Sequence, residues 1–447
     1  MNNPEFKRNI WLELSLHRLI AAPVLLGLIF FVLMQNANDA GFTHSAAQTI
    51  FVISTILWGS HLAFASVSDE LQNRTWDNQR MSALSPFKLA WGKLFGATAF
   101  AWYIGVPCII VVLLTPSTIY SSSAQLSNVP VVISLVLGAL FAQALAFVSA
   151  LIAAKSNVAV PRGVSLLFLF VLMPMVAQIM FDTRNPMQMW YGHELTRYDF
   201  VNASLLAFTA WTWLASYRVM QSALQIKAKP WAMLAFVLFC AFYLFGFTDS
   251  TSLVTSTSIG DFAGIAFVLA VAMVYLGAVT ERRDLVSVRR CINPWLAQNP
   301  ASALKETPYF VVLAVFSLFA LLSTLLSTSI SDNFYFKNAL HNQPFVLLGL
   351  VVFLLMLRDI GLLYYFSLSK KPQRAVMTTF FYLIVLYFLL PLLLPNSVGL
   401  IAFPLMSLAQ STSVYGALVL AVVHVAVVAG LLYKQHLGMN KSLISQA

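Results

Sequence analysis

The chemistry open to this chain is limited by the reactive side chains that lie close together in its sequence. It contains no HExxH, GxSxG or CxxC pattern, so the usual signatures of zinc hydrolases, serine hydrolases and dithiol redox centres are missing. Lys93 lies in WGKLFG, which lacks both the upstream glycine and the following Ser or Thr of a phosphate-binding loop. Cys108, Cys240 and Cys291 are too scattered for a disulfide framework or a metal set. The sequence therefore predicts no catalytic residues, no metal site and no ATP site of its own.

The adjacent pair Arg358 and Asp359 is the best candidate for an ionisable site inside a membrane. It lies late in the long apolar segment 344–365. Near the membrane surface such a pair can reach water by extending its side chains, whereas a pair buried in a cavity is costly and marks a functional site. The sequence leaves both readings open. Other carboxylates at membrane depth are scarce, which argues against coupling to protons or sodium ions.

A second concentration of charge, DELQNRTWDNQRMSALSP at residues 69–86, stands between two apolar segments. Charged groups of both signs suit complementary pairing with another protein, and Trp76 and Met81 beside them are typical interface anchors. The alternative is a solvated loop whose arginines only fix the membrane topology. We favour docking because the mixed charges occur together with the tryptophan. The charged residues are Asp69, Glu70, Arg74, Asp77 and Arg80.

The segments that carry these charges are strongly apolar. Of the 447 residues 60% are apolar and 9% charged, whereas soluble domains have roughly 45–50% and about 25%. Continuous apolar runs of about 20 residues recur along the chain, which indicates membrane helices and excludes a β-barrel. We predict an all-α polytopic membrane protein with about 12 transmembrane helices. The predicted spans are 17–35, 47–66, 94–114, 129–153, 163–181, 199–217, 231–248, 260–279, 308–328, 344–365, 377–395 and 412–433.

The basic residues predict the orientation of these spans. If the N-terminus is cytoplasmic, all 26 Lys and Arg residues lie on the inside except Arg184, Arg197 and Lys337. Both termini are therefore predicted to be cytoplasmic. The net charge of +10 then indicates contact with anionic membrane lipid rather than with nucleic acid.

The lengths and charge order of the loops divide the chain into two diverged six-span halves. The outside stretches 182–198 and 396–411 each predict a re-entrant or interfacial helix pair. The predicted parts are an interfacial amphipathic helix at 1–16, a first half at 17–229 with cytoplasmic loop 67–93, a second half at 230–434 with cytoplasmic loop 280–306, and a cytoplasmic tail at 435–447.

The run SDELQNRTWDNQRMSALSPFKLAWGKLFG at 68–96 resembles the membrane subunits of type-two ABC exporters, in a bacterial branch of that family. In the family an acidic residue closes the second span, a short cytoplasmic helix follows, and a Pro and a Gly-Lys pair open the third span. Arg74 stands where the common pattern has glycine, which leaves open whether the turn is the same. The resemblance implies a location in the bacterial inner membrane and a separate ATPase subunit, holding ATP and Mg, that docks on this helix. The matching positions are Glu70, Thr75, Pro86, Gly92 and Lys93.

The second half carries a weaker version of the same pattern, so equivalent docking there stays open. We expect the permease subunit of an ABC exporter, driven by two copies of an ATP-binding subunit, with one or two copies of this chain. The alternatives are an ATP-independent secondary carrier that uses Arg358 and Asp359, or a polytopic membrane enzyme, whose polar cluster at one membrane face is missing. The aromatic, charge-poor spans hint at an amphiphilic or lipid-like cargo. The candidate coupling residues of the second half are Glu281, Arg282, Arg283, Asp284, Pro300 and Lys305.

Overall fold

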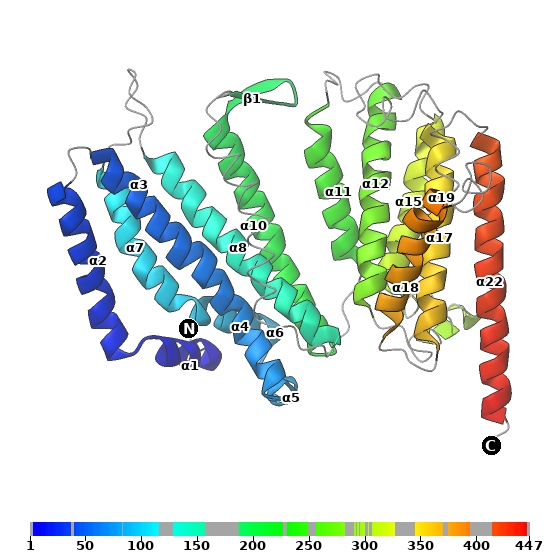
Figure 1. The fold of residues 1–447 in the computed structure, drawn as a ribbon, viewed down its shortest axis with the longest axis horizontal. Coiled ribbons are helices and arrows are strands. Elements are labelled where there is room, and N and C mark those ends of the chain that lie inside the picture. The colour runs from blue at the N-terminus through cyan, green and yellow to red at the C-terminus, as the bar shows by residue number, and fades with distance from the viewer. Residues whose placement is uncertain are drawn as a thin grey trace. The chain divides into compact units, whose positions relative to one another are not determined.

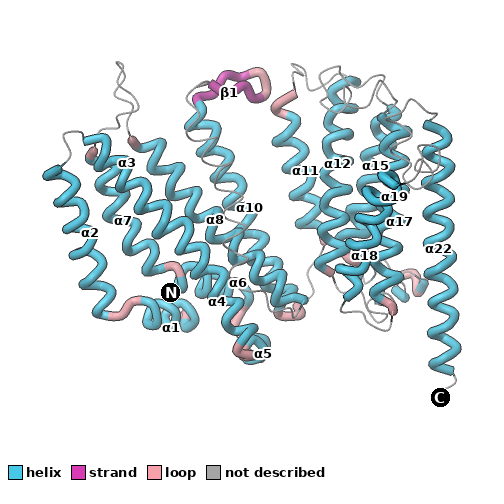
Figure 2. The backbone as a smooth tube through the Cα atoms, viewed as in Figure 1, coloured by secondary structure: helices cyan, strands magenta, loops and turns pink. Residues whose placement is uncertain are grey.

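The helices of the chain form two separate units (Figures 1 and 2). The first comprises residues 1–188 and 194–228, and the second comprises residues 189–193 and 229–447. The computed structural model describes residues 3–36, 40–82, 84–115, 128–156, 187–226, 230–248, 256–281, 290–291, 293–294, 296–299, 303, 306–326, 345–369, 374–393 and 414–444.

The first unit is a helical bundle with two apolar cores. One core joins α4, α6, α8 and α10 through buried side chains such as Phe64, Leu89 and Phe147. The other joins α2, α3, α7 and α8 around Phe51 and Cys108. The helices are α1 (Pro4–Glu13), α2 (Leu16–Asn36), α3 (Ala40–Phe51), the π-helix η1 (Val52–Trp58), α4 (Gly59–Gln72), α5 (Trp76–Arg80), α6 (Pro86–Ala97), α7 (Ala99–Leu114), α8 (Val129–Ser156) and α10 (Arg197–Ala223).

The second unit is a separate bundle around α12, α15 and α17. Phe267, Leu313 and Met356 lie in its main core, and a smaller core joins α17 to α22. Its helices are α11 (Trp231–Phe245), α12 (Ser256–Thr280), α15 (Tyr309–Leu326), α17 (Phe345–Ser367), α18 (Ala375–Ile384), the π-helix η3 (Val385–Leu389), α19 (Leu390–Leu393) and α22 (Val414–Ile444).

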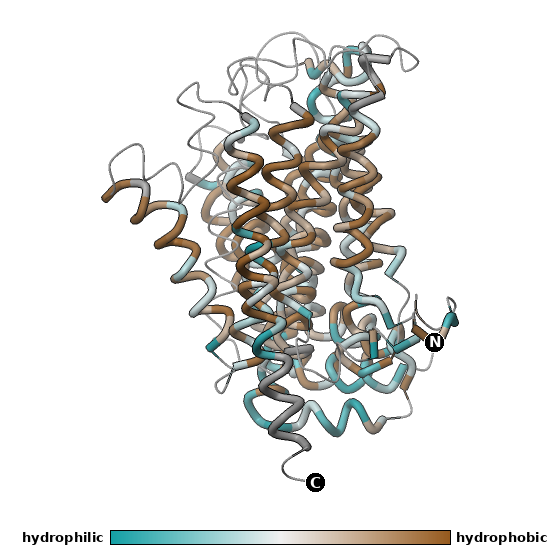
Figure 3. Tube along the Cα trace, turned by 90° about the vertical axis from the view of Figure 1, so that its right-hand side faces the viewer, coloured by the Kyte–Doolittle hydropathy of each residue, from teal (hydrophilic) through white to brown (hydrophobic). Residues whose placement is uncertain are grey.

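The long helices have the length and composition of membrane spans, and Figure 3 shows hydrophobic residues along them. Six helices among the described residues qualify, or up to seven if the pair α6 and α7, bent by 54°, is one span. Shorter apolar helices lie at 231–245, 309–324 and 375–389. The chain is therefore a multi-pass membrane protein, and the prediction of an all-α membrane fold is confirmed at that level. Every predicted span overlaps a described helix except 163–181, which lies outside the described residues.

A β-hairpin occupies part of the stretch that was predicted as an interfacial helix pair, so that prediction was wrong for 187–196. Strands β1 (Met187–Trp190) and β2 (His193–Thr196) pair across Tyr191 and Gly192, which both have positive φ angles of 50° and 73°. Two such residues form the tight turn that suits the twist of paired strands. The Tyr191 hydroxyl donates to Phe242 O, and burial raises the pKa of this phenol to about 12. The corresponding stretch 396–411 lies outside the described residues.

Candidate functional site

The charged stretch of the first unit begins at a turn that ends α4. Thr75 N donates to Glu70 O at 2.8 Å and Arg74 N donates to Leu71 O at 3.2 Å, which is the pair of hydrogen bonds of a Schellman C-cap. Arg74 occupies the left-handed position of this cap, with φ 59°. That position favours glycine, the residue of the common family pattern. The turn therefore has the conformation that a glycine would adopt, although an arginine forms it.

Five side chains from four elements then meet around the carboxylates of Glu5 and Glu70; we call them the Glu70 cluster (Glu5, Arg8, Glu70, Gln79 and Lys93). Lys93 Nζ lies 2.7 Å from Glu70 Oε1 and 3.2 Å from Glu5 Oε1. Arg8 Nη2 bridges the same two carboxylates at 2.9 and 3.0 Å, and Gln79 Nε2 donates to Glu70 Oε1. The Lys93 side chain is 1% exposed. A buried ammonium of this kind is stable only because two carboxylates compensate it.

The helix α1 packs closely on α6 and completes this cluster. A Cβ atom on Gly96 would lie 2.7 Å from Asn9 Cβ, and one on Gly92 would lie 2.9 Å from Glu5 Cβ, so only glycine allows this approach. Asn9 Nδ2 also donates to Gly92 O at 3.3 Å. The buried face of α1 is thus its polar face, whereas Trp11 is 79% exposed. An exposed apolar edge of this kind is typical of a helix that lies in a membrane interface.

The predicted docking residues of loop 67–93 differ in their exposure, from exposed through partly buried to buried. Asp77 is 75% exposed at its side chain and pairs with Arg80, whose Nε donates to Ala223 O at the end of α10. Trp76, predicted as an anchor for a partner, is only 3% exposed and lies in the core of its own unit. The exposed residues are Arg74, Thr75 and Asp77; Asp69, Glu70, Arg80 and Pro86 are partly buried, and Trp76 and Lys93 are buried.

Most predicted coupling residues of the second half lie outside the described residues. Glu281, which directly follows α12, is described and partly buried. Those outside the described ranges are Arg282, Arg283, Asp284, Pro300 and Lys305.

In the second unit the pair Arg358 and Asp359 is buried, each side chain being 3% exposed. Arg358 Nε donates to Asp359 Oδ1 at 2.8 Å, and Nη2 lies 2.7 Å from the same oxygen. Asp359 stands eight residues before the end of α17, or about 12 Å along the helix axis. Of the two readings of this pair, the structure therefore supports the buried one.

Three further residues from three other elements complete what we call the Asp359 cluster (Tyr275, Arg358, Asp359, Tyr387 and His424). The Tyr275 and Tyr387 hydroxyls both donate to Asp359 Oδ2, at 2.8 and 2.7 Å. Arg358 Nη1 contacts His424 Nδ1 at 3.2 Å, and the guanidinium carbon lies 5.0 Å from the centre of the Tyr387 ring. These partners could not be predicted from local sequence pattern, because they lie 28 to 84 positions from Asp359.

A cavity of about 460 Å³ adjoins the Asp359 cluster. Its polar end consists of Tyr275, Asp359 and Tyr387, and the rest of its wall is apolar. The remaining lining residues are Phe380, Leu383, Ile384 and Phe388.

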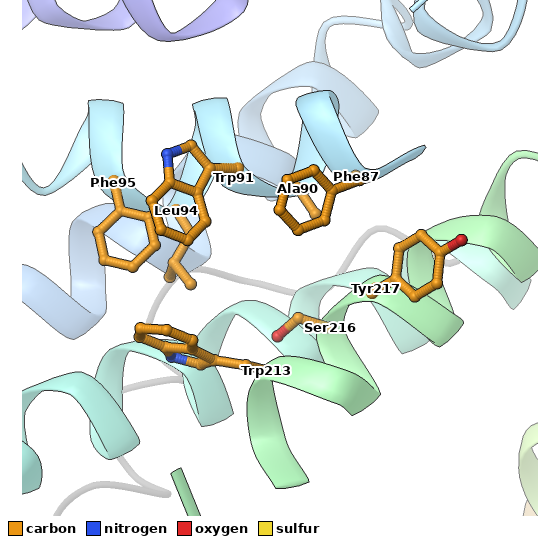
Figure 4. A pocket seen from close by; sticks show the side chains of 8 residues that line it. All are labelled: Phe87, Ala90, Trp91, Leu94, Phe95, Trp213, Ser216 and Tyr217. Atoms are coloured by element: carbon orange, nitrogen blue, oxygen red, sulfur yellow. The ribbon is translucent and has the colours of Figure 1, made fainter. Parts of the chain in front are cut away.

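A much smaller aromatic cavity, of about 60 Å³, lies between α6 and α10 of the first unit (Figure 4). Phe87, Trp91 and Phe95 recur at intervals of four residues along α6, so they share one helix face. Trp213 on α10 meets Trp91 and Phe95 edge to face, with ring centres 6.0 and 5.4 Å apart. The spacing of four residues is visible in the sequence and predicts an aromatic face on this helix. The sequence does not show that α10 packs against that face.

No group of three or more His, Cys, Asp or Glu side chains that could hold a metal ion occurs in the described part of the chain. Comparisons with models of known protein families, with curated proteins and with solved structures find no match to the chain.

Proposed function

We propose that this protein is the permease subunit of a bacterial ABC exporter, with two six-span halves fused in one chain and both termini cytoplasmic. The observation that carries the proposal is the way the Glu70 cluster joins α1, α4, α5 and α6 around an exposed short helix. This is the segment whose sequence resembles the ATPase-docking helix of type-two ABC exporters. The partner subunit would hold ATP and Mg.

The exposed side of the α5 region offers groups for such a docking contact. Asp77 and Arg74 present opposite charges to the solvent, and Met81 is 78% exposed. Charge complementarity gives an interface its specificity, and an apolar side chain beside the charges adds buried area. Trp76 does not take part in the contact itself. It holds α5 in place by packing into the core of its own unit.

The Glu70 cluster connects α5 to three other helices, so a movement of α5 is passed on to them. Movement of α5 pulls on Glu70 through Gln79, and Glu70 is bonded to Lys93 of α6 and Arg8 of α1. Rigid movement of packed helices is a common way to convert a local contact into a global change. ATP-driven closure of the partner would in this way move the ends of three helices together.

Asp77→Arg tests the proposal, because Asp77 is exposed and its ion pair with Arg80 contributes little to folding. The ATPase that copurifies with the tagged chain in mild detergent is identified and quantified. Reversing a charge that is paired in an interface costs about 2–5 kcal/mol, so the bound ATPase falls at least about tenfold.

Glu194→Arg is the matched control: it reverses an exposed carboxylate beyond the opposite end of α10 and leaves the bound ATPase unchanged. If Asp77→Arg retained as much ATPase as the wild type, the docking contact would be refuted. If no ATPase copurified with the wild type even after crosslinking, the ABC proposal itself would fail.

The burial of Arg358 and Asp359 beside a cavity favours a second candidate, an ATP-independent carrier. Buried ionisable residues in membrane helices mark transport pathways in many carriers. A carrier would transport in vesicles that contain this chain alone, and Asp359→Asn would abolish that transport. An exporter subunit would show none without its ATPase.

A further inference from the structure

The polar end of the 460 Å³ cavity presents hydrogen-bond acceptors. A phenol has a single O–H group, and Tyr275 and Tyr387 both donate theirs to Asp359 Oδ2. A carboxylate has only acceptor atoms when it is ionised. A molecule that bonds to this end must therefore bring its own hydrogen-bond donor.

The charges of the Asp359 cluster determine whether that donor should be ionised. Arg358 already compensates Asp359 at 2.7–2.8 Å, through the oxygen opposite the one that the phenols occupy. A cationic head group would bring an uncompensated charge to a buried, low-dielectric site, at high cost. A neutral hydroxyl group offers a donor without that cost.

The walls and the opening of the cavity indicate the rest of the ligand. Phe380, Leu383, Ile384 and Phe388 also line it, and their side chains carry no polar atom. Phe380 and Phe388 are 62% and 73% exposed, so the cavity opens on the outside of its helix bundle. In a membrane protein that side is reached from the lipid, where amphiphiles are concentrated.

The helix that carries Tyr387 is irregular at this cavity. The π-helix η3 spans Val385–Leu389, and its wider turn carries both Tyr387 and Phe388 of the lining. Short π-helices are rare and often occur at functional sites. This irregularity is a second, independent sign that the cavity binds a ligand.

We infer that this cavity binds an uncharged amphiphile whose hydroxyl head donates to the Tyr275, Asp359 and Tyr387 end and whose chain lies against Phe380 and Phe388. The inference rests on the proposed function only in taking the bound molecule as the exported cargo. Binding itself needs this chain alone.

A photolabelling experiment on the full chain in phosphatidylcholine nanodiscs, without any ATPase, tests the inference. The probe is a long-chain alcohol with a diazirine in its chain, and mass spectrometry locates the label, which we expect within residues 375–393. Unlabelled dodecanol competes at a concentration about tenfold lower than dodecyl methyl ether, which has the same chain but no donor. Equal competition by the two would overturn the inference, because the cavity would then be an apolar furrow filled by lipid.

Variants that leave the ion pair intact make the result specific to the cavity. Leu383→Trp fills the cavity and abolishes labelling, whereas Leu389→Trp, in the same helix but outside the lining, retains it. Tyr275→Phe keeps the ring and frees an acceptor position on Asp359 Oδ2, so the preference for dodecanol over the ether is retained. Labelling that survives Leu383→Trp would also overturn the inference. Copurification of the ATPase is scored separately, so loss of alcohol binding with retained ATPase refutes this inference but not the proposed function.

Discussion

Removing the Lys93 ammonium is the most direct test of the Glu70 cluster. Lys93→Met keeps most of the buried volume and deletes the charge that compensates Glu5 and Glu70. The two carboxylates would then share only Arg8, whose side chain is 47% exposed and therefore screened by solvent. Breaking a buried ion pair costs about 3–5 kcal/mol, and the partial exposure of Glu70 (14%) places the expected loss at the lower end, about 3 kcal/mol.

The loss can be measured as a melting temperature by tryptophan fluorescence in detergent. For a folding unit of this size, about 3 kcal/mol corresponds to a decrease of about 6–12 °C. Lys88→Met is the matched control: Lys88 lies in the same helix, is exposed, and forms no ion pair among the described residues, so its loss changes stability by less than about 0.5 kcal/mol. In a Glu70→Gln background Lys93→Met should cost less folding stability, because only the carboxylate of Glu5 is then left without its buried cation. If Lys93→Met and Lys88→Met had the same melting temperature, Lys93 would not be compensating the carboxylates. The proposed transmission of movement from α5 to α6 through Glu70 and Lys93 would then fail.

Three further substitutions test the packing of the same region. Arg74→Gly should raise stability by about 1 kcal/mol, measured as a higher melting temperature, because the left-handed conformation is unfavourable for arginine; a lower value would show that its side chain stabilises the turn. Gly96→Val should detach α1 and expose it to limited proteolysis, whereas Gly27→Val, where an added Cβ meets nothing within 4 Å, should not. Trp76→Ala should cost about 3–5 kcal/mol and Trp11→Ala less than about 0.5 kcal/mol in detergent melts, unless Trp76 serves only a partner.

Helix existence was predictable from the sequence, because long apolar runs have few other stable structures in a membrane. The irregularities within the helices were not. The span predicted at 47–66 belongs to a longer run, Gly41–Gln72, that contains η1, and the span predicted at 377–395 contains η3. Both π-helices lie in apolar stretches whose hydropathy is the same for either type of helix. The hairpin at 187–196 was missed for another reason: its turn places Tyr191 in a left-handed conformation that tyrosine rarely adopts.

The candidate site residues show where sequence reasoning ends. Local pattern drew attention to Glu70 and Lys93, but the sequence could not show that they bond to each other and to Arg8, which is 62 positions away from Glu70. A charged loop next to a membrane span reads as a solvated surface, whereas the same charges become buried when an N-terminal helix covers them. Trp76 illustrates the converse, since a tryptophan among charges suggests an interface anchor but here belongs to the core of its own unit.

The proposed function requires that one helix transmits a movement of α5 to the apolar helices of the first unit. The bend of 54° between α6 and α7, at Thr98, separates Lys93 and the rest of α6 from the more apolar helix α7. In contrast, α4 continues without such a bend through η1 into α3, so a force applied at Glu70 acts along one helical run. That run is held at its π-turn by Gln143, whose side chain donates to Thr55 O and accepts from Trp102. If docking of an ATPase moves the membrane part of the first unit, α4 is therefore the element that transmits the movement, and the π-turn at η1 is the point where the helix can change its register.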